Sequence, residues 1–318
     1  MTTETKKSAR VRFVALFAAF LMFGVAVPAF AQNTTAPMPT TPPPSGAEVP
    51  PPAQDQEQAG PPPARLSPQD PVGPRTTVDT LAEIKRAGKL RVGVSIIVPW
   101  AMHDKDGNLI GFEIDVAKKI ARDIGVSVEF YPDEFRYLVP DLLAGRFDVI
   151  VSGFSISTNR AMQVNFSAPY NTVDVTLVAN KKLAGNFSTL AAFNKENIII
   201  GVLDTSTAVE IAASAFPNAQ LRPYPESADI FNDLLDGKIS AAVADSPRPE
   251  IIAKLFPDKV DIPVARSLAT FPAAFAVRRG DADFVNFLNS WIEARTVNKW
   301  LENRRNYWFK TTDWEKRL

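Results

Sequence analysis

From residue 76 onward, short runs of apolar residues alternate with stretches whose apolar residues recur at helical spacing. The first strand is expected over residues 90–94, and the first amphipathic helix over residues 113–124, which Gly125 ends. Short, continuous apolar strands that alternate with helices are typical of parallel sheets covered by helices on both faces. This alternation limits the fold more than any other feature of the chain, and it predicts an α/β protein.

The remaining expected elements continue the pattern. Further strands are expected over residues 126–131, 148–151, 198–203, 221–224 and 240–244. Further helices are expected over residues 135–144, 208–215, 228–235 and 249–255. Asp106-Gly107 predicts a hairpin turn, and two last segments, residues 273–277 and 283–303, follow the second unit.

The alternation stalls near residues 173–182, where an apolar run gives way to polar residues, and then restarts. Two lobes fit this better than one long sheet, with the last segment returning to the first lobe. Lobe 1 is expected to comprise residues 76–177 and 271–318, and lobe 2 residues 178–270. Each lobe is expected to be a mixed, mostly parallel sheet flanked by helices.

The N-terminal 31 residues have the layout of a secretory signal peptide. Four Lys and Arg residues precede an uncharged apolar run over residues 13–27, and Ala29-Phe30-Ala31 offers a cleavage site before Gln32. The alternative is an uncleaved anchor, because the 19 residues from Phe13 to Ala31 are close to the roughly 20 that a bilayer requires. Both interpretations predict export, and the expected location is the periplasm.

Residues 32–75 have a different composition. Fourteen of the 27 prolines lie between Pro37 and Pro74, with almost no large apolar residue among them. Nothing in such a segment offsets the entropy of ordering it. It is expected to be an extended, disordered linker rich in polyproline II conformation.

Composition excludes several classes of function. The chain has no Cys and a single His, His103, which removes thiolate zinc sites, thiol nucleophiles, disulfides and two-His metal sites. Its formal net charge is zero, so no excess of positive charge favours nucleic-acid binding. No metal, cofactor or nucleic-acid partner is expected. A soluble binding protein, a carboxylate-based enzyme or a sensory module remains.

An anion site is expected after the strand at residues 148–151. Hydroxyl side chains follow this strand up to Asn159, and Arg160 comes one turn into the next helix. A guanidinium beside a helix start can hold a carboxylate through two hydrogen bonds. The plainer alternative is that Ser157 or Thr158 caps the helix while Arg160 is solvated.

The second unit offers a site of opposite charge. Asp245 follows the strand at residues 240–244, and a carboxylate at the carboxyl end of a parallel strand faces the crevice where such sheets bind ligands. Its alternative role is to cap the next helix. Thr207 and Glu210 have the spacing of a capping box. An anion site on one lobe and a cation site on the other are what a zwitterion requires.

Four segments, taken in order, resemble solute-binding protein family 3, the periplasmic amino-acid receptors of ABC transporters. They are GKLRVGV at residues 88–94, DGNLIGFEIDVA at 106–117, GRFDVIVSG at 145–153, and Arg160 followed by FSAPY at 166–170. The resemblance covers residues 81 to about 309. It implies the two-lobed type II fold of periplasmic binding proteins, with the ligand held between the lobes.

The resemblance also implies the ligand-binding residues. Ser155, Arg160 and Thr207 match residues that hold the ligand carboxylate, and Asp245 matches the acid that takes the ammonium group. The full implied set is Trp100, Phe135, Ser152, Gly153, Ser155, Arg160, Ser206, Thr207 and Asp245.

Two of these positions are aromatic pocket walls, and two line the pocket by backbone or side chain. Trp100 and Phe135 are the walls, and Ser152 and Gly153 the lining. The chain departs from the family pattern at Thr205-Ser206, where Gly-Thr or Gly-Ser is usual. It departs again at Ile97, where some receptors for basic amino acids carry an aromatic ring.

The function implied is that of a monomeric receptor that captures a free amino acid by hinge closure and presents it to an ABC permease of the inner membrane. Hinges are expected near residues 175–180 and 267–272. The rival is an exported cyclohexadienyl dehydratase, an enzyme that resembles the same family. Such enzymes keep a catalytic Glu where this chain has Arg248, so no catalytic residue is expected. A sensory module is the third alternative.

Overall fold

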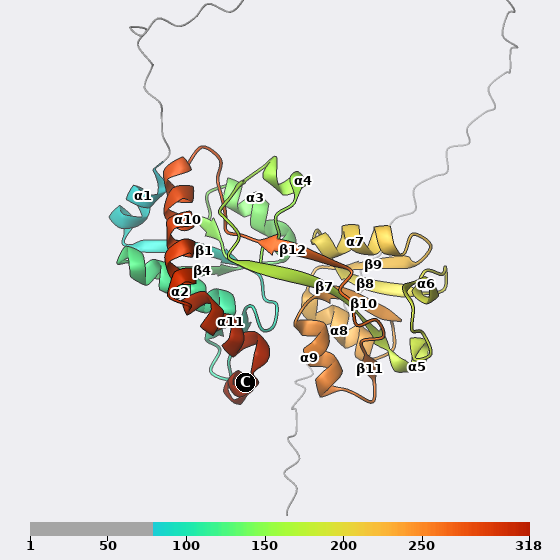
Figure 1. Ribbon diagram of the computed structural model, residues 1–318. Helices are drawn as coiled ribbons and strands as arrows, with labels where there is room; N and C mark the ends of the chain where they lie inside the picture. The colour runs from blue at the N-terminus through green and yellow to red at the C-terminus, as the bar shows by residue number, and fades with distance from the viewer. Residues whose placement is uncertain (1–78) are drawn as a thin grey trace, which may run out of the picture. The chain divides into compact units, whose positions relative to one another are not determined.

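The computed structural model describes residues 79–318 (Figure 1). The expected signal peptide, residues 1–31, and the expected Pro-rich linker, residues 32–75, lie outside the described residues and stay predictions. Among residues 79–318, no helix combines the length and the apolar character that a membrane span requires.

The first sheet has five strands in the order β4-β1-β5-β13-β6. They are β1 (Lys89–Val94), β4 (Ser127–Pro132), β5 (Val149–Ile150), β6 (Asn165–Phe166) and β13 (Ala276–Val277). β1 is parallel to β4 and β5, whereas β13 is antiparallel to β5 and β6. Because β13 follows the whole second sheet in the sequence, the chain returns to its first sheet after building the second.

The second sheet has the order β11-β7-β10-β8-β9, and β12 pairs with β7. Its strands are β7 (Asn171–Asn180), β8 (Ile199–Leu203), β9 (Gln220–Tyr224), β10 (Ala241–Asp245), β11 (Val260–Asp261) and β12 (Ala269–Ala273). β8 is parallel to β9 and β10, and every antiparallel pair involves β7. The separate hairpin of β2 (Met102–His103) and β3 (Leu109–Ile110) confirms the turn predicted at Asp106-Gly107.

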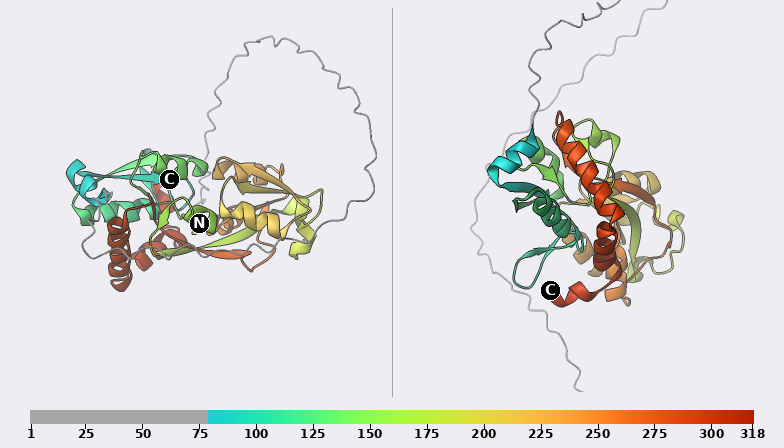
Figure 2. Two further views of the ribbon diagram at one scale, coloured as in Figure 1. Left: turned by 90° about the horizontal axis from the view of Figure 1, so that it is seen from above. Right: turned by 60° about the vertical axis from the view of Figure 1, so that its left-hand side comes forward.

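Helices flank both sheets (Figures 1 and 2). With the first sheet lie α1 (Thr80–Ala87), α2 (Phe112–Ile124), the 3-10 helix η1 (Phe135–Tyr137), α3 (Leu138–Leu143), α4 (Thr158–Ala161), α10 (Ala282–Val297), α11 (Trp300–Lys310) and the 3-10 helix η2 (Asp313–Arg317). With the second sheet lie α5 (Lys181–Ala184), α6 (Leu190–Phe193), α7 (Thr207–Ala215), α8 (Ser227–Leu235) and α9 (Arg248–Leu255). Two mixed sheets flanked by helices confirm the predicted α/β fold class. The second sheet is not mostly parallel, contrary to expectation, because three of its five strand pairs are antiparallel.

Helix α2 shows why the apolar spacing is a sound guide. Its apolar face is buried, and Gly125 ends it in the left-handed conformation at φ 86°, with its N–H donating to the Ala121 carbonyl. The stretch over residues 283–303 is less regular than its composition suggests. It forms two helices, α10 and α11, because Lys299 adopts φ 59° and turns the chain between them.

Strands β7 and β12 connect the two sheets and run side by side (Figures 1 and 2). They pair antiparallel at five positions, from Ala269 opposite Val175 to Ala273 opposite Asn171. The expected hinges, residues 175–180 and 267–272, lie within this pair or next to it. Their role as hinges stays a prediction.

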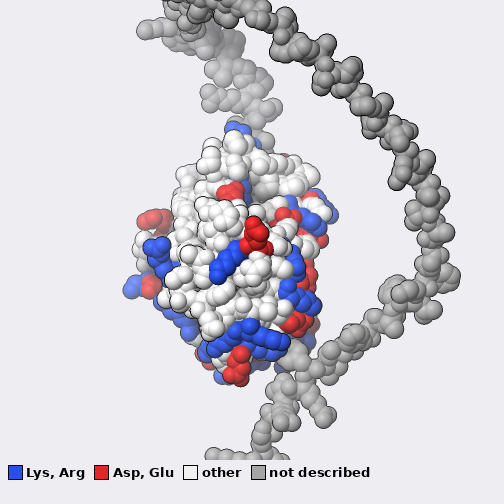
Figure 3. All heavy atoms as spheres, turned by 90° about the vertical axis from the view of Figure 1, so that its right-hand side faces the viewer, with Lys and Arg blue, Asp and Glu red and all other residues white. Residues whose placement is uncertain are grey.

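Charges of both signs occur together on the face at the second-sheet end of the molecule. Figure 3 shows Lys and Arg among Asp and Glu on this face, in keeping with 35 basic and 35 acidic residues in the sequence. A face of mixed sign does not concentrate the positive potential that attracts a phosphate backbone.

Candidate functional site

The loop after β5 places Arg160 in helix α4. Ser157 caps this helix, with its hydroxyl oxygen accepting a hydrogen bond from the Arg160 N–H at 3.4 Å. The cap was therefore predicted correctly, but its companion expectation of a solvated arginine was wrong. Arg160 is only 9% exposed, because its side chain turns inward between the two sheets.

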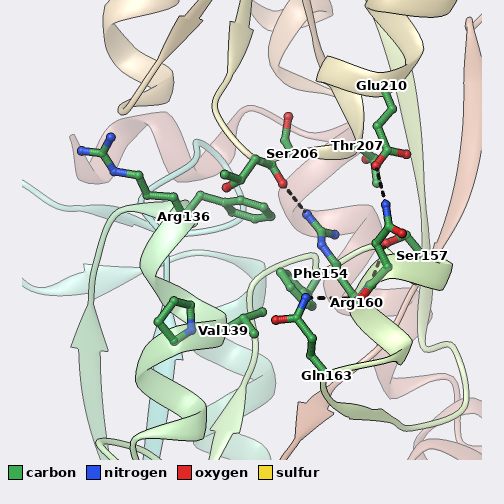
Figure 4. A pocket seen from close by; sticks show the side chains of 13 residues that line it. Arg136, Val139, Phe154, Ser157, Arg160, Gln163, Ser206, Thr207 and Glu210 are labelled. Carbon is green, nitrogen blue, oxygen red and sulfur yellow. Dashed lines mark hydrogen bonds between the residues drawn. The ribbon is translucent and has the colours of Figure 1, made fainter.

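The Arg160 guanidinium is held by two backbone carbonyls. It donates to the carbonyl of Ser155 at 2.8 Å, and to the carbonyl of Thr205 at 3.0 Å, a bond that Figure 4 marks with a dashed line. It also lies over the rings of Phe154 and Phe135, 4.0 and 5.2 Å from their centroids. Burial lowers the pKa of Arg160 to about 10, so the group remains a cation at neutral pH. The site thus contains a fixed positive charge with neutral partners.

Asp245 is the opposite charge, and it ends strand β10. Its Oδ1 atom is buried and has no hydrogen-bond partner among the described residues. Burial raises the pKa of Asp245 to about 6, although the charge of Arg160 acts in the opposite direction. Asp245 does not cap α9, because Pro247 occupies the capping position and no side chain bonds the helix start. An unpaired buried acceptor indicates a place for a cationic donor.

Two cavities lie beside these charges. The larger has a volume of about 300 Å³ (Figure 4). It is lined by Phe135, Arg136, Val139, Pro140, Phe154, Ser157, Asn159, Arg160, Gln163, Thr205, Ser206, Thr207 and Glu210. The smaller, of about 10 Å³, is lined by Ile97, Leu203, Ser206, Ala208, Ser227, Ile230, Ala244, Asp245 and Arg248. Each cavity is lined by residues from the first-sheet part and from the second-sheet part of the chain, and Ser206 lines both cavities.

The structure brings five of the nine residues expected from sequence to these cavities. They are Phe135, Arg160, Ser206, Thr207 and Asp245. The other four, Trp100, Ser152, Gly153 and Ser155, are buried or sit behind the lining. Ser155 contributes through its carbonyl, and the Ser152 hydroxyl accepts a hydrogen bond from the Ser95 N–H at 3.0 Å.

Trp100 packs in the core instead of lining a cavity. It is 4% exposed, and its ring lies 5.9 Å from that of Phe112 and 4.6 Å from that of Phe309. Gly153 adopts φ 57° in front of it, and a Cβ there would lie 3.0 Å from the indole. Any contact between Trp100 and a ligand stays a prediction, while its support of the Gly153 loop is visible.

Glu113 holds the same loop from beneath. It is fully buried, its Oε1 accepts the Gly153 N–H at 3.0 Å, and the Tyr170 hydroxyl donates to its carboxyl group at 2.8 Å. Burial raises the pKa of Glu113 to about 8, and the two hydrogen bonds oppose this shift. Glu113 is therefore mostly a neutral carboxyl group at pH 7.

A pH-dependent contribution to stability follows. Because the folded pKa lies above the unfolded one, the folded state binds more protons, and stability falls as the pH rises from about 4.5 to 8. Glu113→Gln keeps the shape and removes the titration. The free energy of unfolding, measured with urea, should fall between pH 5 and pH 8 in both proteins. The fall should be smaller in E113Q than in the wild type, and the difference between the two falls should exceed about 1 kcal/mol. Glu83→Gln, at an exposed position, is the matched control, and an identical fall in E113Q would contradict this account.

Thr205, in the loop before α7, carries backbone strain. It adopts φ 57°, which a β-branched residue rarely tolerates, and its carbonyl accepts the bond from Arg160. This is the position where the sequence departs from the Gly that the family resemblance implies.

Thr205→Gly is expected to stabilise the fold by about 1 kcal/mol, because relief of strain exceeds the entropy that glycine adds to the unfolded chain. Chemical denaturation measures the change. Thr205→Ala is the control, since it shortens the side chain but keeps the Cβ and hence the strain. Equal stability of the two variants would show that the strain is absent.

The predicted capping box at Thr207 and Glu210 is wrong. Ser206 precedes α7, no side chain bonds the helix start, and Thr207 is already helical. Glu210 instead accepts a hydrogen bond from the Asn159 side-chain amide at 3.4 Å. Its carboxylate is drawn to a partner from the first-sheet side, which sequence spacing cannot reveal.

Six polar residues of the larger cavity and two of the smaller were not expected as site residues from the sequence. They are Arg136, Ser157, Asn159, Gln163, Thr205 and Glu210 in the larger cavity, and Ser227 and Arg248 in the smaller. The position of Arg136 could have been predicted, because it directly follows Phe135, an expected pocket residue. In the structure its guanidinium lies 3.8 Å from the Asp204 carboxylate. Arg248 was expected only to replace the catalytic Glu of the dehydratases, and its position three residues after Asp245 did not reveal that it lines a cavity.

Comparison with known proteins gives the setting of this site. Residues 90–311 match the family model described as bacterial extracellular solute-binding proteins, family 3. Among curated relatives, the cyclohexadienyl dehydratase of Pseudomonas aeruginosa is 24% identical over 231 residues, which cover 72% of this chain and 86% of that protein. The L-cystine-binding protein TcyJ of Escherichia coli K12 is 23% identical over 230 residues, which cover 72% and 85%.

Solved structures resemble the chain at somewhat higher identity. The putative ABC transporter binding component of Wolinella succinogenes, complexed with lysine, aligns with a TM-score of 0.68 at 30% identity and covers 72% of this chain and 99% of that one. An ancestral amino acid-binding protein, described as a precursor of cyclohexadienyl dehydratase, aligns with a TM-score of 0.66 at 31% identity and covers 73% and 100%.

Proposed function

The chain belongs to the family 3 bacterial extracellular solute-binding proteins, and we propose that it captures one free amino acid between its two lobes and delivers it to an ABC importer. The observation that carries this proposal is the pair of opposite charges in the cleft. Arg160 is a buried cation with neutral partners, and Asp245 is a partly buried acid whose Oδ1 atom is buried and unpaired. A zwitterion supplies the group that each of them lacks.

In the proposed complex the ligand carboxylate binds the guanidinium of Arg160. The carboxylate replaces the Thr205 carbonyl as an acceptor and also accepts a hydrogen bond from Ser155 or Thr207. The ligand ammonium group donates to Asp245. Each charge-assisted hydrogen bond contributes about 1.5–3 kcal/mol, and micromolar affinity requires about 8 kcal/mol. Three such contacts, with packing on Phe135, are sufficient.

We propose that closure of the lobes tells the permease that a ligand is bound. Lobe 1, residues 76–177 and 271–318, supplies Arg160, and lobe 2, residues 178–270, supplies Asp245. Because only the closed form lets both lobes touch the ligand, the ligand shifts the population toward that form. We propose that an inner-membrane permease binds the closed form of the monomer, which acts outside the cytoplasm after export.

Ligand binding without catalysis is the favoured form of this function. The dehydratase relative shows that the fold can host an enzyme. In this chain Asp245 and Arg248 both line the small cavity, so the residue three positions after Asp245 is a permanent cation rather than a proton-transfer acid.

A thermal-shift screen of the twenty amino acids tests the proposal. A ligand at 100 times its dissociation constant adds about 2.7 kcal/mol of stability, which raises the melting temperature measurably. No shift with any amino acid would refute the receptor. Incubation with prephenate and arogenate is the second arm, and formation of product would replace the receptor with the enzyme.

A further inference from the structure

Arg248 stands beside Asp245 in the smaller cavity, and its position is fixed by helix α9. It is the first residue of that helix and is partly buried. Ile97, from the loop after β1, and Ser206, from the start of α7, line the same cavity. Arg248 therefore lines the same small cavity as Asp245, whose Oδ1 atom has no partner among the described residues.

The Arg248 guanidinium lacks a hydrogen-bonding or ionic partner among residues 79–318. Its only specific contact there is with the ring of Phe231, whose centroid lies 5.2 Å away. Burial lowers the pKa of Arg248 to about 10, with no neighbouring charge acting on it, so it is still a cation at neutral pH. Asp245, three residues earlier at the end of β10, does not pair with it.

The other two arginines of the cleft each have at least one hydrogen-bonding or ionic partner. Arg160 has two carbonyl acceptors, and Arg136 lies within ion-pair distance of Glu134 and Asp204. A partly buried cation with no partner in the protein can gain charge-assisted hydrogen bonds from an anionic ligand. Arg248 is the cleft arginine in the described part of the chain that lacks such a partner.

The other side of Arg248 offers no negatively charged partner for the guanidinium. There it borders a cavity of about 350 Å³ whose lining is mainly apolar and includes Trp314 and Glu315. The Glu315 carboxylate forms no ion pair with Arg248 within 4.0 Å, so this cavity leaves the guanidinium unpaired.

We propose that Arg248 selects a ligand with a second anionic group, so that the receptor takes an acidic amino acid whose side-chain carboxylate binds this guanidinium. The inference rests on the proposed function, because Arg160 and Asp245 hold the main-chain groups of the same ligand. It separates this chain from the relative solved with lysine. A cationic side chain brought to Arg248 would meet a like charge in a cavity of low dielectric constant.

Isothermal titration calorimetry with L-glutamate, L-glutamine, L-aspartate, L-asparagine and L-arginine tests this. Each acid and its amide have nearly the same shape, so the ratio of their dissociation constants isolates the side-chain charge. In the wild type, glutamate or aspartate should bind at least about tenfold tighter than its amide, and arginine should bind more weakly than either acid.

Arg248→Gln should remove most of that ratio while the amide still binds, because the groups that hold the main chain are untouched. Arg248→Lys should keep part of it through its charge. Arg266→Gln is the matched control, since Arg266 is exposed, lies in the same lobe and lines neither cleft cavity. It removes the same net charge and should leave the ratio unchanged.

The outcomes separate the two proposals. Binding of glutamine, arginine or another non-acidic amino acid as tightly as the acids, with the ratio unaffected by R248Q, overturns this inference and leaves the receptor function standing. Failure of every amino acid to bind overturns the receptor function and this inference with it. If R248Q does not fold, the wild-type ratio together with R248K decides.

Discussion

Arg160→Ala is expected to weaken binding of the receptor's amino acid by at least about 30-fold. Removal of one member of a buried charge pair costs about 2–5 kcal/mol, much of it from the charge that is left without a partner. Here the ligand carboxylate would lose its only cationic partner in the proposed complex. The loss should appear in calorimetry with whichever amino acid gives the largest thermal shift in the screen.

The fold should survive this substitution. Arg160 stands on a helix of four residues and bonds two loop carbonyls, so it is not part of a sheet's hydrogen-bond ladder. Circular dichroism and the melting curve check this. Arg279→Ala is the matched control, because Arg279 is an exposed arginine whose guanidinium donates to the Met162 carbonyl at 3.0 Å. Unchanged affinity in R160A would remove Arg160 from the site.

Asp245→Asn is expected to have two opposite effects, weaker binding and a more stable ligand-free protein. The binding loss should again be about 30-fold or more, because the amide cannot balance the ligand ammonium charge. The gain in stability follows from the pKa. Asp245 titrates near 6 in the folded protein against an ordinary value of 3.8.

The sign of the stability effect follows from proton binding. Between pH 4 and pH 6 the folded state binds more protons at Asp245 than the unfolded state does, so stability falls as the pH rises. The shift corresponds to a cost on the order of 3 kcal/mol, which persists at neutral pH. Asp245→Asn should remove this cost at pH 7, and the advantage should vanish near pH 4.

Protonation of Asp245 should also weaken ligand binding, so affinity should change with pH in the direction opposite to stability. Below pH 6 the wild-type affinity should fall as Asp245 takes up a proton, by up to about tenfold per pH unit, whereas the affinity of D245N should stay flat. Asp258→Asn, at an exposed acid of the same lobe, is the control and should change neither property. A variant that binds less but is no more stable at pH 7 would show that Asp245 is not desolvated in the cleft.

The sequence is most informative where the determinants are local. The spacing of apolar residues and a glycine decide helix α2, and Ser157 caps the helix that carries Arg160. Local signals also place Asp245 at the end of β10. The two charges of the cleft can therefore be predicted from the order of the residues alone.

The rest depends on partners far away in the sequence. Trp100 lies in the core because Phe309, about 200 residues later, packs on its ring. Glu210 bonds Asn159 of the other segment instead of its own helix start. The residues next to Arg248 in the sequence do not predict that its guanidinium will lack a partner. Each of these facts arises from packing between segments, which spacing along the chain does not encode.

The bonds from Arg160 to the Ser155 and Thr205 carbonyls set a threshold for what the receptor detects. In the proposed complex, the protein's own backbone competes with the ligand for the guanidinium, so the ligand must displace an amide oxygen that already accepts from it. A neutral sugar or alcohol offers no better acceptor than that oxygen, while a full negative charge does. The proposed receptor is therefore expected to respond to anionic groups and not to uncharged solutes.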